Sequence, residues 1–167
     1  MPELTTKKIL DVTCGSRTIW FDKHHPAALY LDRRVVHERN VWGVNHSERT
    51  CDVEPDIVAD FTKLPFSDGS FALVVFDPPH LISAGDNSWM VKKYGRLDEN
   101  WPQMIHDGFC ECMRVLRDDG ILIFKWSEVQ ISTRKVIDAI GCEPLFGHRS
   151  GKKMNTHWMC YMKGVST

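Results

Sequence analysis

The residues best suited to chemistry are Asp77, Pro78, Pro79 and His80, which directly follow the apolar run 71–76. The two prolines have no N–H to donate and fix their own φ, so they hold the carbonyl groups of Asp77 and Pro78 in set directions. A carboxylate and a carbonyl that both accept hydrogen bonds suit a planar amino group, and the ring of His80 can stack on the heterocycle that carries it. The motif predicts a catalytic site for an exocyclic amine, with a plain proline-rich turn as the alternative.

Aspartates also accompany other apolar runs. The runs 7–12, 27–31, 57–59, 71–76 and 121–124 have the length and composition of buried strands. Near the ends of four of them stand Asp11, Asp32, Asp60 and Asp77. In open α/β sheets, ligands bind just outside the carboxyl ends of parallel strands. One such aspartate alone more often caps a helix or forms a turn, but the repetition predicts a site along one sheet edge.

Helices and a terminal hairpin complete the predicted fold. Apolar residues recur at helical spacing in 101–116, and a second helix is expected over 129–140, ending at Gly141. The last two strands, 143–147 and 156–162, are predicted to pair as a hairpin. We therefore expect an α/β fold with a mostly parallel seven-stranded sheet and an antiparallel C-terminal hairpin.

Two segments do not fit the alternation of strands and helices. The polar segment 37–55 stands where a crossover helix is expected, and we predict that a helix there is short or absent. The segment 81–100 is too long and mixed for a tight connection, and loops of that length beside a site often act as lids, although a plain surface loop is the alternative. Substrate binding by this predicted lid, through stacking or phosphate contacts, is expected from Trp89, Lys92, Lys93 and Tyr94.

Length and charge restrict the function classes. With 167 residues the chain is expected to form a single domain over 1–167, without room for a separate recognition domain of ordinary size. The 21 basic and 22 acidic residues give a net charge of −1, which excludes a polycation that coats nucleic acid, so any such contact must be local. No apolar stretch approaches the roughly 20 residues that cross a bilayer, so no membrane partner is expected.

Cysteine and histidine usage indicates neither disulfides nor a metal. The six cysteines show no paired Cys-x-x-Cys spacing, and the first residues lack the apolar stretch of a secretory signal, so we expect reduced thiols and a cytoplasmic location. Cys110, Cys112 and the pair His24-His25 lack the ligand spacing of a structural zinc site, so metal binding is not expected.

The segment 11–18, Asp-Val-Thr-Cys-Gly-Ser-Arg-Thr, resembles the cofactor loop of class I S-adenosylmethionine-dependent methyltransferases, especially the Asp-Pro-x-Cys-Gly-Ser-Gly-Thr form of amino-methyltransferases. The resemblance implies a Rossmann-like, doubly wound sheet. It assigns contacts with S-adenosyl-L-methionine, around its methionine part, to Asp11, Thr13, Cys14, Gly15 and Ser16. Arg17 stands where that form has glycine, and because a Cβ disfavours positive φ, we expect the loop to turn differently here.

Three further positions carry the resemblance in the family's order. Asp32 is similar to the acidic residue that binds the cofactor's ribose hydroxyls, and Asp60 with Phe61 resembles the segment that contacts its adenine. The motif 77–80 resembles the catalytic motif of enzymes that methylate adenine N6 or cytosine N4, in which the fourth residue is usually Tyr, Phe or Trp. Histidine can still stack there, with a dependence on pH near neutrality. The chain looks most similar to small stand-alone methyltransferases of bacteria and their phages.

The resemblance implies a direct displacement in which an amino nitrogen takes the methyl group of S-adenosyl-L-methionine. Hydrogen bonds to Asp77 and to the Pro78 carbonyl would favour a pyramidal nitrogen, and alignment of the reacting atoms would supply most of the rate. The predicted substrate is adenine or cytosine in DNA or RNA, which must be unstacked to enter the pocket. Since the chain is small, single-stranded or structured RNA, a homodimer that completes the cleft, and a small substrate all stay open.

Two other functions stay open as well. A methyltransferase of a small molecule or a protein amide gains support from the near-neutral charge and the missing recognition domain. A catalytically silent cofactor-binding protein that works through a partner gains support from Arg17 and His80, which depart from the family pattern.

Overall fold

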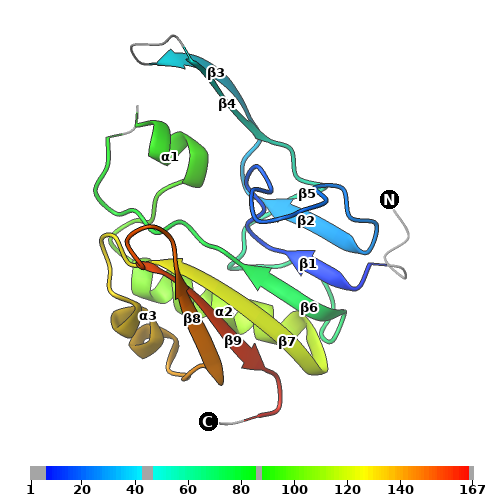
Figure 1. The fold of residues 1–167 in the computed structure, drawn as a ribbon. Helices are drawn as coiled ribbons and strands as arrows, with labels where there is room; N and C mark the ends of the chain where they lie inside the picture. The colour runs from blue at the N-terminus through cyan, green and yellow to red at the C-terminus, as the bar shows by residue number, and fades with distance from the viewer. Residues whose placement is uncertain (1–6, 43–46, 86–87, 166–167) are drawn as a thin grey trace.

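The computed structural model describes residues 7–42, 47–85 and 88–165, so that residues 86–87 of the predicted lid lie outside the described part (Figure 1). A seven-stranded sheet forms its centre, with the strand order β5-β2-β1-β6-β7-β9-β8. The strands are β1 (Ile9–Asp11), β2 (Ala28–Asp32), β5 (Ile57–Val58), β6 (Phe71–Phe76), β7 (Leu116–Ser127), β8 (Phe146–Ser150) and β9 (Thr156–Met162). Strands β5, β2, β1, β6 and β7 run parallel, and β9 runs antiparallel to both β7 and β8. The predicted sheet with its antiparallel C-terminal hairpin is confirmed.

Between β2 and β5 the chain forms a two-stranded antiparallel ribbon, β3 (Val36–Trp42) and β4 (Ser47–Val53). The ribbon projects from the body at the top of Figure 1. The described residues of the segment 37–55 contain no helix, as predicted, and most of them belong to β3 and β4. The sequence did not predict that they pair as a ribbon.

Two helices cover one face of the sheet, α2 (Trp101–Val115) and α3 (Thr133–Ile140), which both lie behind it in Figure 1. Ile105 and Phe109 of α2 belong to the same buried core as Phe76 and Phe124 of the sheet, whose rings stack with centroids 5.0 Å apart. The prediction of a helix over 101–116 is confirmed, and that over 129–140 is too long at its start. There the Glu128 carboxylate accepts hydrogen bonds from the amide and hydroxyl of Thr133, which holds residues 129–132 in a turn.

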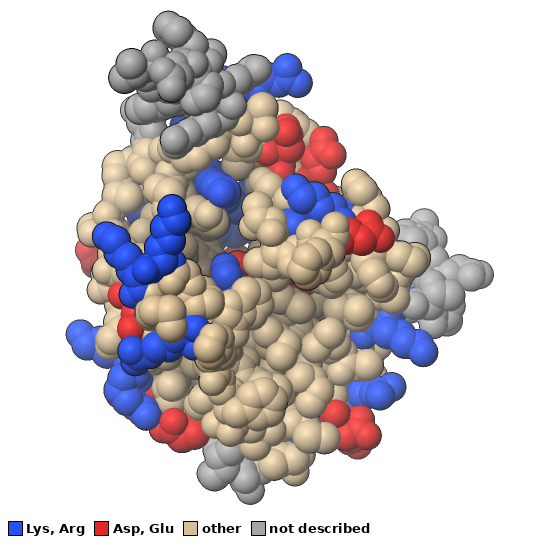
Figure 2. Space-filling model, viewed as in Figure 1, with Lys and Arg blue, Asp and Glu red and all other residues tan. Residues whose placement is uncertain are grey.

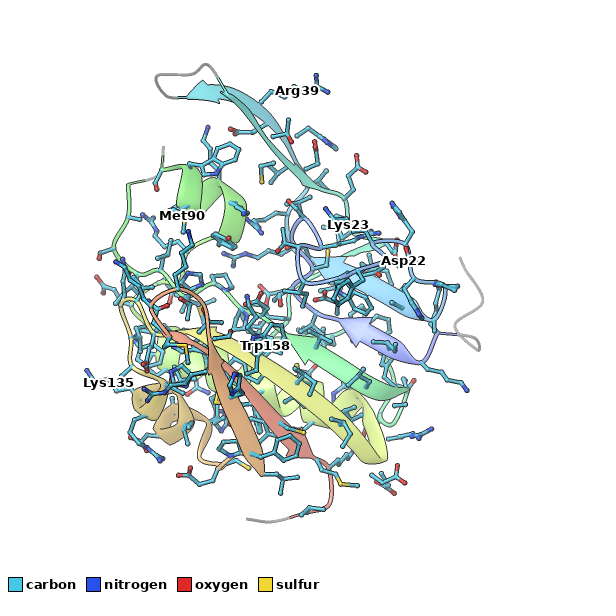
Figure 3. The ribbon with its side chains drawn as sticks, viewed as in Figure 1. Asp22, Lys23, Arg39, Met90, Lys135 and Trp158 are labelled. Atoms are coloured by element: carbon cyan, nitrogen blue, oxygen red, sulfur yellow. The ribbon has the colours of Figure 1, made fainter. Side chains whose placement is uncertain are left out.

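The opposite face of the sheet is covered only in part. The segment 12–27 crosses from β1 to β2 in turns, and its Trp20 packs edge-on against Tyr30 with ring centroids 5.0 Å apart. Farther along the sheet, Phe146 is 68% exposed and Trp158 lies on the surface facing the viewer (Figure 3). In Figure 2, uncharged atoms form a broad area over β6, β7, β8 and β9. In the described part of the chain, no helix has the length and apolar character to span a membrane.

Candidate active site

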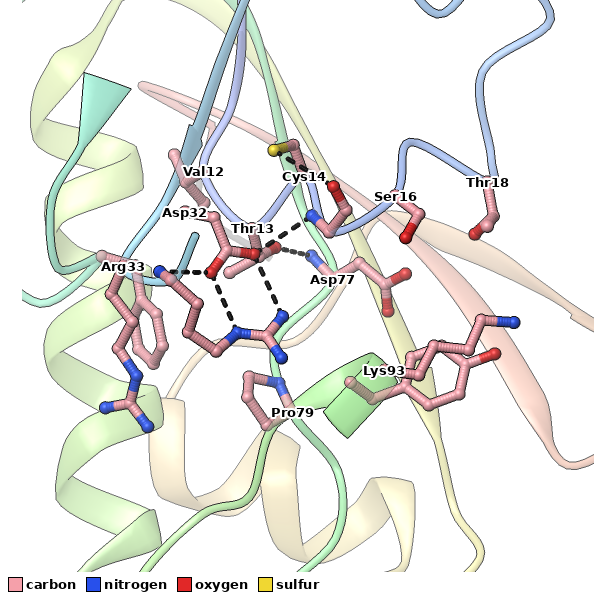
Figure 4. Close-up of a pocket in the computed structure, with 14 residues that line it drawn as sticks. Val12, Thr13, Cys14, Ser16, Thr18, Asp32, Arg33, Asp77, Pro79 and Lys93 are labelled. Atoms are coloured by element: carbon pink, nitrogen blue, oxygen red, sulfur yellow. Dashed lines mark hydrogen bonds and ion pairs between the residues drawn. The ribbon is translucent and has the colours of Figure 1, made fainter. Parts of the chain in front are cut away.

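A pocket opens at the carboxyl edge of the sheet, where β1, β2 and β6 end opposite the short helix α1 (Trp89–Tyr94) (Figure 4). In the space-filling view a hollow lies between α1 and the segment that joins β1 to β2, with Lys and Arg atoms on its rim (Figure 2). Most residues that the sequence predicts for a site line this pocket: Thr13, Cys14, Gly15, Ser16, Asp32, Phe61, Asp77, Pro79, Lys93 and Tyr94. The predicted edge of the sheet thus gathers residues from five separate segments around one cavity.

The loop after β1 presents its backbone to the pocket at Gly15. This residue has φ +49, in the left-handed region that favours glycine, and no atom lies within 4 Å of the place that a Cβ would take. Its amide donates a hydrogen bond to Asp32 Oδ2 (3.1 Å), and the Asp77 amide donates to Thr13 Oγ1 (2.8 Å). The loop, Asp32 and Asp77 are therefore held in one hydrogen-bonded unit.

Asp11 lies beneath this loop and does not line the pocket. Its side chain accepts hydrogen bonds from the Thr13 amide (3.2 Å) and from the Trp20 indole (2.7 Å), and the residue is 1% exposed. Burial raises the pKa of Asp11 to about 7, although the bonds from Trp20 and Thr13 lower it. Asp11 supports the loop from below.

Arg17 adopts the left-handed conformation after all, with φ 53. Its guanidinium donates to the carbonyls of Lys23 (2.6 Å) and Glu54 (2.7 Å), lies 3.5 Å from the Asp56 carboxylate, and stacks over the Tyr30 ring at 3.8 Å. These contacts offset the roughly 1–2 kcal/mol that a left-handed non-glycine residue costs. The prediction that arginine here makes the loop avoid positive φ is wrong.

Asp32 stands at the end of β2 with its carboxylate paired to Arg34. Asp32 Oδ1 accepts bonds from the Arg34 amide (3.0 Å) and Nε (3.1 Å), and Oδ2 accepts one from a terminal nitrogen of the same guanidinium (3.2 Å). Arg34 lines the pocket together with Asp32. Sequence reasoning did not single out Arg34, because nothing in the dipeptide Arg33-Arg34 tells which side chain turns inward.

Asp60 and Phe61, which the sequence assigns together to the cofactor's adenine, differ in their place relative to the pocket. Asp60 Oδ1 accepts hydrogen bonds from the amide and the hydroxyl of Thr62, both at 2.8 Å, which is the turn-forming arrangement that was the alternative for a strand-end aspartate. Asp60 does not line the pocket, whereas Phe61 does. The Phe61 ring packs on Phe76 and closely approaches Gly108, where a Cβ would lie 2.5 Å from it. Phe61 supplies the pocket with a firmly backed apolar wall.

Asp77 forms an ion pair with Lys125, which lies near the end of β7, with Oδ2 and Nζ 2.5 Å apart. Burial raises the pKa of Asp77, and the Lys125 ammonium lowers it. The sequence reasoning did not count Lys125 among the catalytic residues. The signal was present in the strand register, because Phe76 pairs with Phe124 and the next residues on the two parallel strands therefore meet.

His80 is 9% exposed and backs the pocket without lining it. Its ring lies 5.5 Å from that of Tyr94 and 6.5 Å from that of the fully buried Trp126. Burial, together with the Lys125 charge, lowers the pKa of His80 to about 4. His80 is therefore neutral at neutral pH, and the predicted pH dependence of its stacking near neutrality is wrong. Tyr94 presents the aromatic surface that faces the cavity.

The predicted lid 81–100 contains α1 and is closed at its base, where the Leu97 amide donates to the Leu81 carbonyl (2.8 Å). Lys93 and Tyr94 face the pocket, while Lys92 forms an ion pair with Glu38 of β3 (2.5 Å). Three predicted residues besides Asp11, Asp60 and His80 stay outside the pocket lining: Pro78, Trp89 and Lys92. Among the described residues, no group of three His, Cys, Asp or Glu side chains is arranged to hold a metal ion.

Comparisons with known proteins give structural matches alone. No protein-family model and no curated protein matches the sequence. A crystal structure of a Pyrococcus horikoshii OT3 protein superposes on 98% of the chain and 85% of its own, with a TM-score of 0.57 and 15% identity. A protein from Methanosarcina mazei described as a SAM-dependent methyltransferase covers 93% of this chain and 92% of its own (TM-score 0.51, 11% identity). The chain has the class I methyltransferase fold.

Another methyltransferase extends this comparison. Geranyl diphosphate C-methyltransferase from Streptomyces coelicolor, crystallised with Mg²⁺, geranyl diphosphate and S-adenosyl-L-homocysteine, matches 95% of this chain and 71% of its own, with a TM-score of 0.52 and 10% identity. At these identities the likeness concerns the fold, and function has to be argued from the pocket itself.

Proposed function

We propose that the chain is an S-adenosyl-L-methionine-dependent methyltransferase that acts on an exocyclic amino nitrogen of adenine or cytosine in DNA or RNA. The observation that carries this proposal is that one cavity contains both halves of such a site. The loop at Gly15 and the strand-end Asp32 line this cavity together with Asp77 and Tyr94.

The cofactor half fits the proposed ligand. The open space above Gly15 lets the ligand approach the backbone, and the Asp32 carboxylate is an acceptor of the kind that binds ribose hydroxyls. Phe61 offers an apolar surface for an adenine ring. When bound, the cofactor supplies an electrophilic methyl group on a sulfonium centre.

The target half suits an aromatic amine. In the proposed reaction, Asp77 accepts a hydrogen bond from the amino group, which favours a pyramidal nitrogen with a free lone pair. The Lys125 ammonium lowers the pKa of this carboxylate against the larger effect of burial, and the Tyr94 ring, backed by His80, forms the stacking surface for the base. After the methyl group has been transferred, the excess proton passes to Asp77 or to water.

Basic groups at the mouth of the pocket support a nucleic-acid target. Lys93 Nζ lies over the Tyr94 ring, 4.9 Å from its centre, so a cation already stands at the face of the proposed stacking surface. Arg33 is exposed at the pocket lining, and lysine and arginine atoms lie on its rim in Figure 2. Such local charges contact phosphates even in a chain whose net charge is −1.

A small-molecule methyltransferase is the second candidate. It is favoured by the Lys125 ammonium that is paired with Asp77, because such a cation can bind an anionic group, and by the shared fold of the geranyl diphosphate enzyme. In this function, phosphate polymers would not compete with methyl transfer.

The test is incubation with methyl-labelled S-adenosyl-L-methionine and separate pools of DNA, RNA and small amines. We expect label in a nucleic-acid pool, at least about a hundredfold less with Asp77→Ala, and an unchanged rate with Asp138→Ala, an exposed carboxylate on α3. Label in the small amines alone supports the second candidate. Label in no pool despite tight cofactor binding contradicts both and indicates a catalytically silent protein.

A further inference from the structure

The Asp32 carboxylate has no acceptor capacity left. Two hydrogen bonds reach each oxygen: the amide and Nε of Arg34 donate to Oδ1, and the Gly15 amide and a terminal nitrogen of Arg34 donate to Oδ2. An ionised carboxylate offers about four lone-pair sites, so this one is saturated. Any ligand that donates hydrogen bonds to Asp32 must displace a donor that is already there.

Two of these four donors cannot move away easily. The Gly15 amide and the Arg34 amide belong to the backbone next to β1 and β2, which are central strands of the sheet. The other two donors belong to the Arg34 side chain, which lies in the pocket and can swing out through its flexible stem. A ribose diol that takes two acceptor sites on Asp32 therefore takes the place of the Arg34 guanidinium.

The same guanidinium also holds α1. Its remaining terminal nitrogen donates to the Lys92 carbonyl in the last turn of that helix (3.1 Å), where the Cys51 thiol is the second donor (3.8 Å). Helix α1 has six residues, none of them buried, and its N-cap Ser88 makes no side-chain hydrogen bond to the helix. Since so short a helix is marginal by itself, contacts such as that of Arg34 decide whether it stays docked.

We propose that Arg34 is a competitor for the ribose position and at the same time the latch of α1, so that binding of the cofactor at Asp32 releases this helix. The inference rests on the proposed cofactor site. When the ribose hydroxyls occupy Asp32, the guanidinium leaves, its bond to the Lys92 carbonyl breaks, and the side of the pocket formed by Lys93 and Tyr94 loosens. The coupling is reciprocal, so that freeing α1 strengthens cofactor binding.

The test combines calorimetry with hydrogen exchange of the α1 amides, using S-adenosyl-L-homocysteine as the probe. In the natural protein we expect the probe to speed exchange in 89–95. In Arg34→Ala, exchange is expected to be fast without the probe and unaffected by it, and the probe to bind at least about fivefold more tightly. Arg34→Gln keeps much of the length of the side chain without its charge and serves as a second variant in case Arg34→Ala folds poorly. Its exchange rate in α1 and its affinity for the probe are expected to lie between those of the natural protein and Arg34→Ala.

The matched control is Arg39→Ala, because Arg39 is an exposed arginine on β3 that points away from the body (Figure 3). This variant should leave both the hydrogen exchange of α1 and the affinity for the probe unchanged. Slower exchange of α1 on binding, or weaker binding by Arg34→Ala and Arg34→Gln, would overturn the latch. If the natural protein binds no probe, the proposed function fails, whereas exchange of α1 in the unliganded Arg34 variants still decides whether Arg34 holds the helix.

Discussion

Replacement of Asp11 by asparagine is predicted to change how the stability of the protein depends on pH. Asp11 is 1% exposed, and burial raises its pKa from the ordinary 3.8 to about 7. Because the folded state then binds the proton more tightly than the unfolded state, the stabilisation is complete below pH 3.8 and is lost as the pH rises to about 7. At 1.36 kcal/mol per pKa unit, this loss amounts to about 4 kcal/mol.

Asp11→Asn keeps the shape and an acceptor oxygen for Trp20 or Thr13 but carries no titrating proton. The free energy of unfolding of the variant, minus that of the natural protein, should therefore rise by about 4 kcal/mol between pH 4 and pH 8. His80 has the opposite effect: its lowered pKa makes stability rise with pH between about 4 and 6.5. Since both proteins contain His80, its effect cancels in the difference.

The assay is urea unfolding at a series of pH values, followed by tryptophan fluorescence and analysed as a two-state transition. Asp138→Asn, at an exposed carboxylate of α3, is the matched control and should give a difference that stays nearly constant with pH. A constant difference for Asp11→Asn as well would mean that Asp11 ionises in the folded protein as it does in the unfolded chain, contrary to this prediction.

Three further predictions concern the walls of the pocket. The free energy of unfolding of His80→Phe, minus that of the natural protein, should fall by about 3 kcal/mol between pH 4 and 6.5, because the variant lacks the gain that the lowered pKa of His80 gives over this range. Both proteins contain Asp11, so its opposite effect cancels in the difference, and a constant difference in urea unfolding would contradict the burial argument. Lys125→Met should move the acid limb of the methylation rate to higher pH, because the pKa of Asp77 rises without the ammonium, while Lys125→Arg keeps the limb in place. A methylation rate that Lys125→Met lowers equally at every pH would contradict this and show that Lys125 has another role. Gly108→Ala should lower the free energy of unfolding by about 1–3 kcal/mol and weaken cofactor binding, because its Cβ would lie 2.5 Å from the Phe61 ring. Urea unfolding measures the first effect and calorimetry the second, and unchanged values in both would contradict the prediction.

Local patterns predicted much of the fold because the strands that matter are apolar runs with polar ends. The apolar run before Asp77 forms β6, and the helix predicted from the spacing of apolar residues after Trp101 is α2, which ends within one residue of the predicted position. The hairpin was also predicted, although β8 begins at Phe146 and not at 143. The ribbon of β3 and β4 was missed because its polar residues show neither the period of a helix nor that of a half-buried strand.

The sequence predicted the strand ends that form the site, but not the ion-pair partners of their aspartates. That Asp32 and Asp77 share one pocket follows from the strand order, whereas their partners Arg34 and Lys125 depend on side-chain directions and strand register. The same limit applies to His80, whose burial beside Trp126 arises from tertiary packing. The residues of the site were therefore easier to predict than the charged partners and the burial that shift their pKa values.

Titration calorimetry with S-adenosyl-L-homocysteine measures whether the pocket at the carboxyl edge takes an S-adenosyl-L-methionine type ligand through Asp32. We predict saturable binding at one site per chain, weakened at least about tenfold in Asp32→Ala because a charge-assisted hydrogen bond is lost. Absence of binding, or equal affinity in the two proteins, would contradict the account.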